Sequence, residues 1–118
     1  MTGSHLPSAW RIAVIALAAA ACGTAAARAA DLGHGRKIAQ TKCQMCHGLD
    51  GQAKLPEAPN LSGQTEIYIV KQLNAFRSGE RKNETMSLVA PTLSDDDVAD
   101  VAAYYAAIEI TIGKVPGE

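Results

Sequence analysis

Apolar residues recur at the spacing of an α-helix in three parts of the chain. The clearest pattern follows Ser94, where one helix face carries apolar residues at positions i, i+3, i+4 and i+7: Val98, Val101, Ala102 and Tyr105. Ser94 and Asp97 have the types and spacing of a capping box, in which each side chain accepts a hydrogen bond from the backbone of the other residue. The pattern predicts a helix that begins after Ser94.

Two more helices are predicted upstream. One lies between Thr65, a suitable N-cap residue, and Gly79, which can adopt the left-handed conformation that ends a helix. Its apolar face is formed by Ile69, Val70, Leu73 and Phe76. The other spans about Gly33 to Met45, with Ile38 as its main apolar residue. Between them, residues 49–64 are rich in glycine, proline and polar residues and predict a long loop. Because strand alternation is nowhere convincing, the predicted fold class is all-α with three main helices.

The beginning of the chain has the pattern of a secretory signal peptide. Arg11 precedes an unbroken apolar run from Ile12 to Ala21, and Ala27-Arg28-Ala29 fits an A-x-A cleavage site. We expect residues 1–29 to be removed on export to the periplasm and residues 30–118 to form one domain. The alternative is an uncleaved membrane anchor, but the apolar run is shorter than the ~20 residues of a membrane span.

Cys22 allows another arrangement, because a cysteine after an alanine-rich stretch can be the lipid attachment site of a bacterial lipoprotein. Alanine, in place of leucine, stands three residues before it, which fits that motif poorly. A single acyl chain would in any case hold a domain only weakly at a membrane. We therefore expect no lipid anchor and no membrane span in the exported form.

The charge and size of the expected mature domain narrow its function. Loss of residues 1–29 would leave 9 basic residues against 12 acidic ones, a balance that argues against binding to nucleic acid. The remaining 89 residues include one phenylalanine, three tyrosines and no tryptophan. A domain this small usually needs a disulfide, a metal or a cofactor to complete its core.

The segment CQMCH, which ends the first predicted helix, is the strongest chemical signal. Cys43, Cys46 and His47 stand at i, i+3 and i+4 and therefore project from one helix face. Zinc normally takes four ligands, and no further cysteine follows in the expected mature domain. Thiol redox pairs occupy a helix N-terminus in a βαβ unit, whereas this pair ends a helix in an all-α chain. The remaining interpretation is covalent attachment of haem c, for which Cys-x-x-Cys-His is the specific short signal.

A haem iron bound by His47 on one side has methionine, histidine or an open position on the other. Met45 lies inside the attachment motif, and Met1 would leave with the signal peptide. Met86, on the loop that links the second and third predicted helices, is then the candidate for the second axial ligand. A lone methionine more commonly fills a gap in a core. Here polar residues precede it, which favours a ligand that reaches inward from a loop.

The chain resembles the class I cytochrome c family from about Leu32 to Ile108. Beyond CQMCHG, the resemblance rests on four segments in matching order: GRKIAQTKC, APNLSGQ, YIVKQLNAFRSGER and LSDDDVADVAAYYAAI. Among bacterial members it is similar to the small periplasmic proteins with one haem, or to one half of a dihaem relative. The resemblance implies a small cytochrome c fold, in which three main helices and loops wrap around one covalently bound haem.

The resemblance also implies roles for single residues. Cys43 and Cys46 match the thioether sites, His47 the proximal ligand and Met86 the distal ligand of the haem iron. Pro59 matches a proline whose carbonyl accepts a hydrogen bond from the proximal histidine, which orients the imidazole and raises its basicity.

Further positions follow from the same resemblance. Gly35 and Tyr104 match the place where the first and last helices cross. The candidates for contacts near a haem propionate are Tyr68, Gln72 and Arg81; a solvated helix face is the alternative for them. The chain departs from the family at Ala39, where an aromatic residue is frequent, and at Ser87, where proline commonly follows the ligand methionine.

The function implied by the resemblance is that of a single-electron carrier, which is not an enzyme. Its partners would be redox proteins, such as a dehydrogenase donor and an oxidase or reductase acceptor. An alternative is a tightly bound electron-accepting subunit of a periplasmic dehydrogenase, with residues 109–118 either as a docking strand or as a frayed end. A third hypothesis, a haem enzyme or gas sensor with an open iron site, requires that Met86 does not bind the iron.

Overall fold

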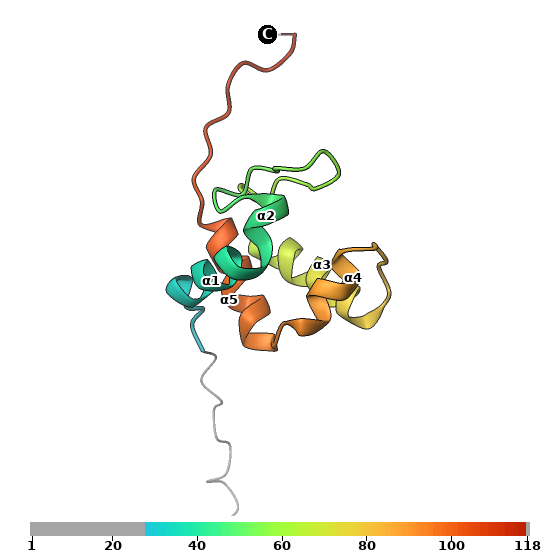
Figure 1. Ribbon diagram of the computed structural model, residues 1–118. Helices are drawn as coiled ribbons and strands as arrows, with labels where there is room; N and C mark the ends of the chain where they lie inside the picture. The colour runs from blue at the N-terminus through green and yellow to red at the C-terminus, as the bar shows by residue number, and fades with distance from the viewer. Residues whose placement is uncertain (1–27, 118) are drawn as a thin grey trace, which may run out of the picture.

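The structure is a computed structural model that describes residues 28–117. The predicted signal peptide and the alternative lipid site at Cys22 therefore lie outside the described residues. In chain order the elements are α1 (Leu32–Ile38), η2 (Ala39–Cys43), α2 (Gln44–His47), α3 (Glu66–Ser78), α4 (Met86–Val89), η3 (Ala90–Thr92) and α5 (Asp95–Ala106). Within residues 28–117 every regular element is helical, which confirms the predicted all-α class (Figure 1).

The two best-patterned helices form where the sequence predicts them. Thr65 caps α3 by accepting a hydrogen bond from the Tyr68 N–H, and Gly79 ends this helix with a φ of 80°. Ser94 and Asp97 form a capping box at the start of α5, with reciprocal N···O distances of 3.1 and 2.9 Å. Both helix starts depend on contacts within a few residues, which is why the local sequence predicts them.

The first predicted helix, about Gly33 to Met45, is present, but it is not α-helical throughout. The helix begins at Leu32, where Asp31 caps it, and its middle widens into the π-helical segment η2 before α2 ends at His47. The Gln44 N–H donates to the Ala39 carbonyl five residues earlier, which marks the wider turn. The Thr41 hydroxyl donates to the carbonyls of Lys37 and Ile38 and so supplies these groups with a partner. Such π-helical turns are frequent at functional sites, and this one ends at Cys43.

The segment between α3 and α5 also differs from the prediction. Met86 was expected on a loop, whereas it is the first residue of the short helix α4. Asn83 explains the difference, because its side-chain oxygen accepts hydrogen bonds from the N–H groups of Thr85 and Met86. The turn that carries Met86 is thus initiated by a polar side chain, and a periodic apolar pattern plays no part in it.

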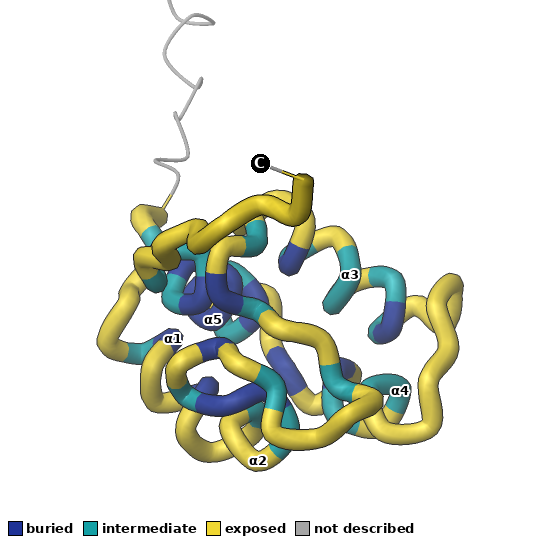
Figure 2. The backbone as a smooth tube through the Cα atoms, turned by 90° about the horizontal axis from the view of Figure 1, so that it is seen from above, coloured by how far each residue is buried: buried dark blue, intermediate teal, exposed yellow. Residues whose placement is uncertain are grey.

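The core lies where α1 crosses α5 (Figure 2). Gly35 is buried at this crossing, and a Cβ atom at its position would overlap the main chain of Asp100 and approach the Cβ of Tyr104. The backbones of the two helices approach closely because glycine has no side chain. The buried apolar cluster around the crossing consists of Ile38, Ala39, Ile69, Leu93, Val98, Val101, Ala102 and Tyr105. None of the described helices has the length and apolar character needed to cross a membrane.

A buried carboxylate lies beside this crossing. The Asp100 side chain is 0% exposed and accepts hydrogen bonds from the Asp31 N–H and from His34 Nδ1, both at 2.8 Å. The Arg28 guanidinium adds two bonds of 2.9 Å, one to each carboxylate oxygen. The predicted cleavage after Ala29 stays a prediction; it would remove Arg28 and leave the other two donors in place.

We expect the Asp100 carboxylate to make stability depend on pH. Hydrogen bonds from Arg28 hold the pKa of this carboxyl well below its usual range, despite the opposing effect of burial. A carboxyl whose pKa is lower in the folded state than in the unfolded state stabilises the fold at pH values above the unfolded-state pKa of about 4. This stabilisation decreases as the pH falls from the unfolded-state pKa towards the folded-state pKa. In a chain that retains Arg28, Asp100→Asn is expected to lower the melting temperature at pH 7, with the deficit relative to the parent shrinking at pH 3.

Thermal unfolding followed by circular dichroism between pH 7 and pH 3 measures the difference. Asp96→Asn is a suitable control, because the Asp96 side chain is on the same helix and 72% exposed. An Asp100→Asn deficit that is the same at pH 7 and pH 3 would contradict the role of its charge.

Candidate haem site

The attachment motif lies on two successive elements. Cys43 is the last residue of η2, while Cys46 and His47 belong to α2. Both cysteines are free thiols of intermediate burial, and the imidazole-bearing residue His47 is only 7% exposed. Burial raises the pKa of the Cys43 thiol to about 11, so this group is protonated at neutral pH in the unmodified chain. The two thiols are therefore available for attachment and are not joined in a disulfide.

The His47 imidazole is oriented by the loop that follows it. Its Nδ1 lies 2.9 Å from the Pro59 carbonyl oxygen, to which it donates. The loop is in turn joined to α2 and to itself, because the Lys54 N–H donates to the Cys46 carbonyl at 2.8 Å and the Leu61 N–H to the Gly51 carbonyl at 2.7 Å. With Nδ1 engaged, Nε2 is the nitrogen of this ring that remains for coordination of a metal.

Two tyrosines of α5 hold the backbone directly after His47. The Tyr105 hydroxyl donates to the Gly48 carbonyl at 3.0 Å, and the Tyr104 hydroxyl donates to the Leu49 carbonyl at 2.8 Å. Tyr105 is 1% exposed, and burial raises the pKa of its phenol well above the usual range, so it stays a neutral donor. Helix α5 therefore fixes the end of α2 through two hydroxyl groups.

Met86 is half-buried at the start of α4. Its N–H donates to Asn83 Oδ1 at 2.9 Å, so the position of its main chain is set by a neighbouring side chain. Met45, the other methionine of the described part, is 84% exposed on α2. The roles of His47 and Met86 as axial ligands remain predictions.

The three candidates for propionate contacts are only partly brought together. Gln72 Oε1 accepts a hydrogen bond of 2.6 Å from the Arg81 guanidinium, which also lies 4.6 Å from the centre of the Phe76 ring. Tyr68 precedes Gln72 by one turn of α3 and is 47% exposed, but no hydrogen bond of its hydroxyl links it to the other two. Gln72 and Arg81 are thus joined by a hydrogen bond, and Tyr68 lies on the same side of α3 as Gln72 without a hydrogen bond from its hydroxyl to either residue.

Sequence reasoning missed several residues that hold the site. The sequence places Tyr105 on a buried helix face and Tyr104 at the crossing of the first and last helices. The hydrogen bonds of their hydroxyls to the backbone after His47 carry no sequence signal. Asn83, by contrast, had a readable signal, because an asparagine three residues before a helical residue is a frequent capping arrangement.

The Cytochrome c family model matches residues 33–107, which is more than half of the chain. The chain belongs to the cytochrome c family. Cytochrome c-554(548) of Halomonas halodenitrificans is 46% identical over 70 residues, which cover 57% of this chain and 84% of that protein.

Longer relatives match over part of their length. The crystal structure of reduced recombinant cytochrome c4 from Pseudomonas stutzeri superposes with a TM-score of 0.62 and 36% identity, over 72% of this chain and 49% of that one. The thiosulfate dehydrogenase electron acceptor of Stutzerimonas stutzeri is 43% identical over 68 residues, which cover 55% of this chain and 32% of that protein. The chain thus spans about half of the first protein and about a third of the second.

Family membership establishes the cofactor as covalently attached haem c and the activity as electron transfer. The residues present fit this cofactor. Two free thiols and an imidazole with an available Nε2 lie within five positions of one helical segment. The chemistry of this donor set matches two thioether bonds and one axial nitrogen ligand.

We expect the two tyrosine hydroxyls to differ in their importance for stability. Tyr105→Phe removes one of the two hydrogen bonds to the carbonyl of Gly48, a buried residue that then keeps only the bond of 3.2 Å from the Gly51 N–H. The lost bond costs about 1 kcal/mol of unfolding free energy. Tyr104→Phe is a matched control with a smaller expected loss, because Leu49 and Tyr104 are only half-buried and water can replace the hydroxyl. Denaturant unfolding of the haem-loaded protein measures both losses, and equal losses would contradict this explanation.

Proposed function

We propose that this chain is a periplasmic single-electron carrier with one haem c bound through residues 43–47, and that it is not itself an enzyme. The supporting observation is the arrangement around His47, in which Nδ1 is engaged by the Pro59 carbonyl and the following backbone is held by α5. One Cys-x-x-Cys-His segment occurs in the 118 residues, in agreement with one haem for this chain. The proposed axial ligands are His47 and Met86.

The chain's own residues have separate tasks in this proposal. The bound haem supplies an iron that alternates between Fe(II) and Fe(III). Cys43 and Cys46 anchor the cofactor, and the Pro59 carbonyl orients His47 and raises the basicity of its free nitrogen. The thioether of Met86 is a neutral, soft ligand, which favours the ferrous state and a high reduction potential. Gln72 and Arg81 are proposed to contact a propionate together, with Tyr68 beside them.

The ligand assignment is tested by spectroscopy of the purified, haem-loaded protein. A pyridine spectrum is expected to show one c-type haem, and the oxidised protein is expected to show the weak near-infrared band of iron bound by methionine sulfur. Met86→Ala should abolish this band. Met45→Ala is the matched control and should keep it, because Met45 lies 84% exposed between the two cysteines.

The outcomes separate the hypotheses. Loss of the band in Met45→Ala, or its persistence in Met86→Ala, would show that the distal assignment is wrong. A parent protein without the band but with a high-spin iron would favour the open-site enzyme or gas sensor.

A second candidate function is that of an electron-accepting subunit of a dehydrogenase. It is favoured by the similarity to a protein named thiosulfate dehydrogenase electron acceptor. Residues 109–117 add an exposed extension beyond α5, in which Ile110 and Ile112 are 54% and 79% exposed (Figure 1). Such an extension offers apolar side chains to a partner protein.

The two functions differ in the expected state of the protein. A free carrier should elute from a sizing column as a monomer at both low and high salt, since electron-transfer encounters are small and transient. A subunit should co-purify with a larger protein from its native cells, and removal of residues 109–118 should release it. Monomeric elution of the native material at both salt concentrations would count against the subunit.

A further inference from the structure

We propose that Asn83 is the positioning residue for Met86 and sets how readily this methionine is displaced from the iron. The inference rests on the proposed ligand role of Met86. It concerns a residue that contacts neither the attachment cysteines nor His47 in any hydrogen bond of the described chain. The supporting observations are the contacts of Asn83 and the surface on which they lie.

Asn83 makes four hydrogen bonds, one with Met86, one with Thr85 and two with Ser87. Its side-chain Oδ1 accepts from the Thr85 N–H at 3.0 Å and from the Met86 N–H at 2.9 Å. Its main-chain carbonyl accepts from the Ser87 N–H at 3.0 Å, and its own N–H donates to Ser87 Oγ at 3.0 Å. Three consecutive residues centred on Met86 are therefore held by one asparagine.

Ser87 takes part in two of these hydrogen bonds. It stands where the family commonly has a proline, and the two bonds give this difference a physical role. A proline at position 87 has neither an N–H nor a hydroxyl, so it could make neither of the two bonds that join Ser87 to Asn83. A proline would instead restrict the backbone through its ring. In this chain the restriction after Met86 comes from hydrogen bonds to Asn83.

The segment that connects α3 to α5, residues 79–94, is held near each end by contacts that do not involve Asn83. At the upstream end, the Arg81 N–H donates to the Ala75 carbonyl at 2.9 Å, and its guanidinium pairs with Gln72 on α3. At the downstream end, Lys42 Nζ donates to Thr92 Oγ1 at 3.0 Å. Residues 82–85 between these points are exposed. Within this stretch the bonds of Asn83 add to the two helical bonds that the Thr85 carbonyl accepts from the N–H groups of Leu88 and Val89.

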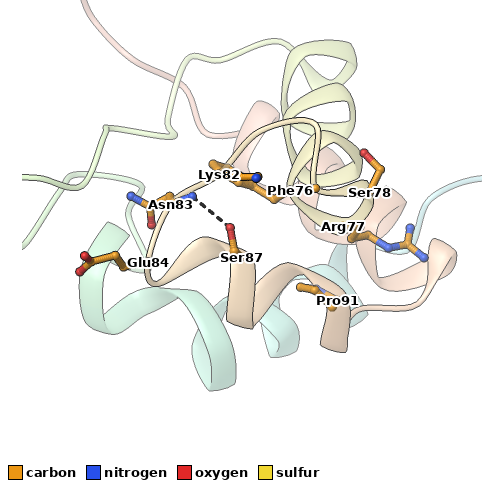
Figure 3. A pocket seen from close by; sticks show the side chains of 9 residues that line it. Phe76, Arg77, Ser78, Lys82, Asn83, Glu84, Ser87 and Pro91 are labelled. Carbon is orange, nitrogen blue, oxygen red and sulfur yellow. Dashed lines mark hydrogen bonds between the residues drawn. The ribbon is translucent and has the colours of Figure 1, made fainter.

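A surface hollow borders the same segment (Figure 3). Its volume is about 680 Å³, and it lies between the end of α3 and α4. Asn83 and Ser87 are at its edge, joined by their hydrogen bond, and Phe76, Lys82 and Pro91 also line it. Neither His47 nor Met86 is among the lining residues. Asn83 and Ser87 therefore lie at an open surface, and hydrogen bonds join them to the main chain around Met86.

This arrangement leads to a specific expectation for ligand exchange. An external ligand such as imidazole can bind the ferric iron only after the methionine leaves. Loss of the two side-chain bonds of Asn83 removes restraints on the main chain of Met86 and makes its departure easier. We expect Asn83→Ala to bind imidazole about tenfold more tightly than the parent or better, since each lost bond carries a modest free energy.

The experiment titrates imidazole into the oxidised, haem-loaded protein and follows the main haem absorption band and the near-infrared methionine band. Asn83→Asp is the rescue variant, because it keeps an acceptor oxygen at the same place and should bind imidazole within about threefold of the parent. Glu84→Ala is the matched control: Glu84 is the exposed neighbour of Asn83 and should leave the affinity unchanged. Ser87→Ala removes one of the four bonds and should give a smaller increase than Asn83→Ala.

Parent-like imidazole affinity in Asn83→Ala, or an equal increase in Asn83→Ala and Asn83→Asp, would overturn the proposal. If Asn83→Ala fails to yield haem-loaded protein, the comparison of Ser87→Ala with Glu84→Ala decides instead, and equal affinities would overturn it. Failure of the ligand assignment is separate. In that case the parent lacks the near-infrared band and Met86→Ala binds imidazole as the parent does.

Discussion

The close crossing of α1 over α5 at Gly35 is the contact on which the rest of the structure depends. The absence of a side chain at Gly35 lets α1 lie against the Asp100 main chain. Tyr104 and Tyr105 follow about one turn further along α5, so the crossing also brings their hydroxyls to the carbonyls of Leu49 and Gly48. The residues next to His47 are thus placed by the same contact that forms the core. In a domain this small, the contacts that form the core also determine the position of the ligand residue His47.

The two sides of the proposed iron site are held by different kinds of interaction. The proximal side depends on buried contacts, with Tyr105 1% exposed and His47 7% exposed, so its order is lost only when the core opens. The distal side depends on hydrogen bonds among exposed residues, which can open locally while the rest of the domain stays folded. Cysteine attachment and the imidazole therefore belong to the stable part of the molecule. The methionine belongs to the part that can exchange.

Sequence patterns predicted the elements whose signals are local. The capping residues Thr65 and Ser94 fixed the starts of α3 and α5, because their partners lie within three residues. The π-helical turn before Cys43 could not be predicted, since helical periodicity does not distinguish a bond over four residues from one over five. The acidic residue Asp100 reads as polar and exposed, and its burial depends on donors 66 to 72 positions away. The family resemblance supplied the pairing of His47 with Pro59, which the spacing of these residues alone does not indicate.

Under the proposed assignment of Met86 as the distal ligand, the serine that follows it replaces the restraint of a proline ring by hydrogen bonds. A proline ring restricts the backbone at all times, whereas the bonds of Ser87 and Asn83 compete with water because both partners are accessible. A segment held by such bonds spends more time open, by an amount that the strength of each bond determines. The rigid proximal half does not take part in this opening. Under the proposed ligand assignment, a change at one exposed asparagine would therefore shift the molecule from a closed carrier towards a protein that binds external ligands, while the buried contacts of the proximal side stay in place.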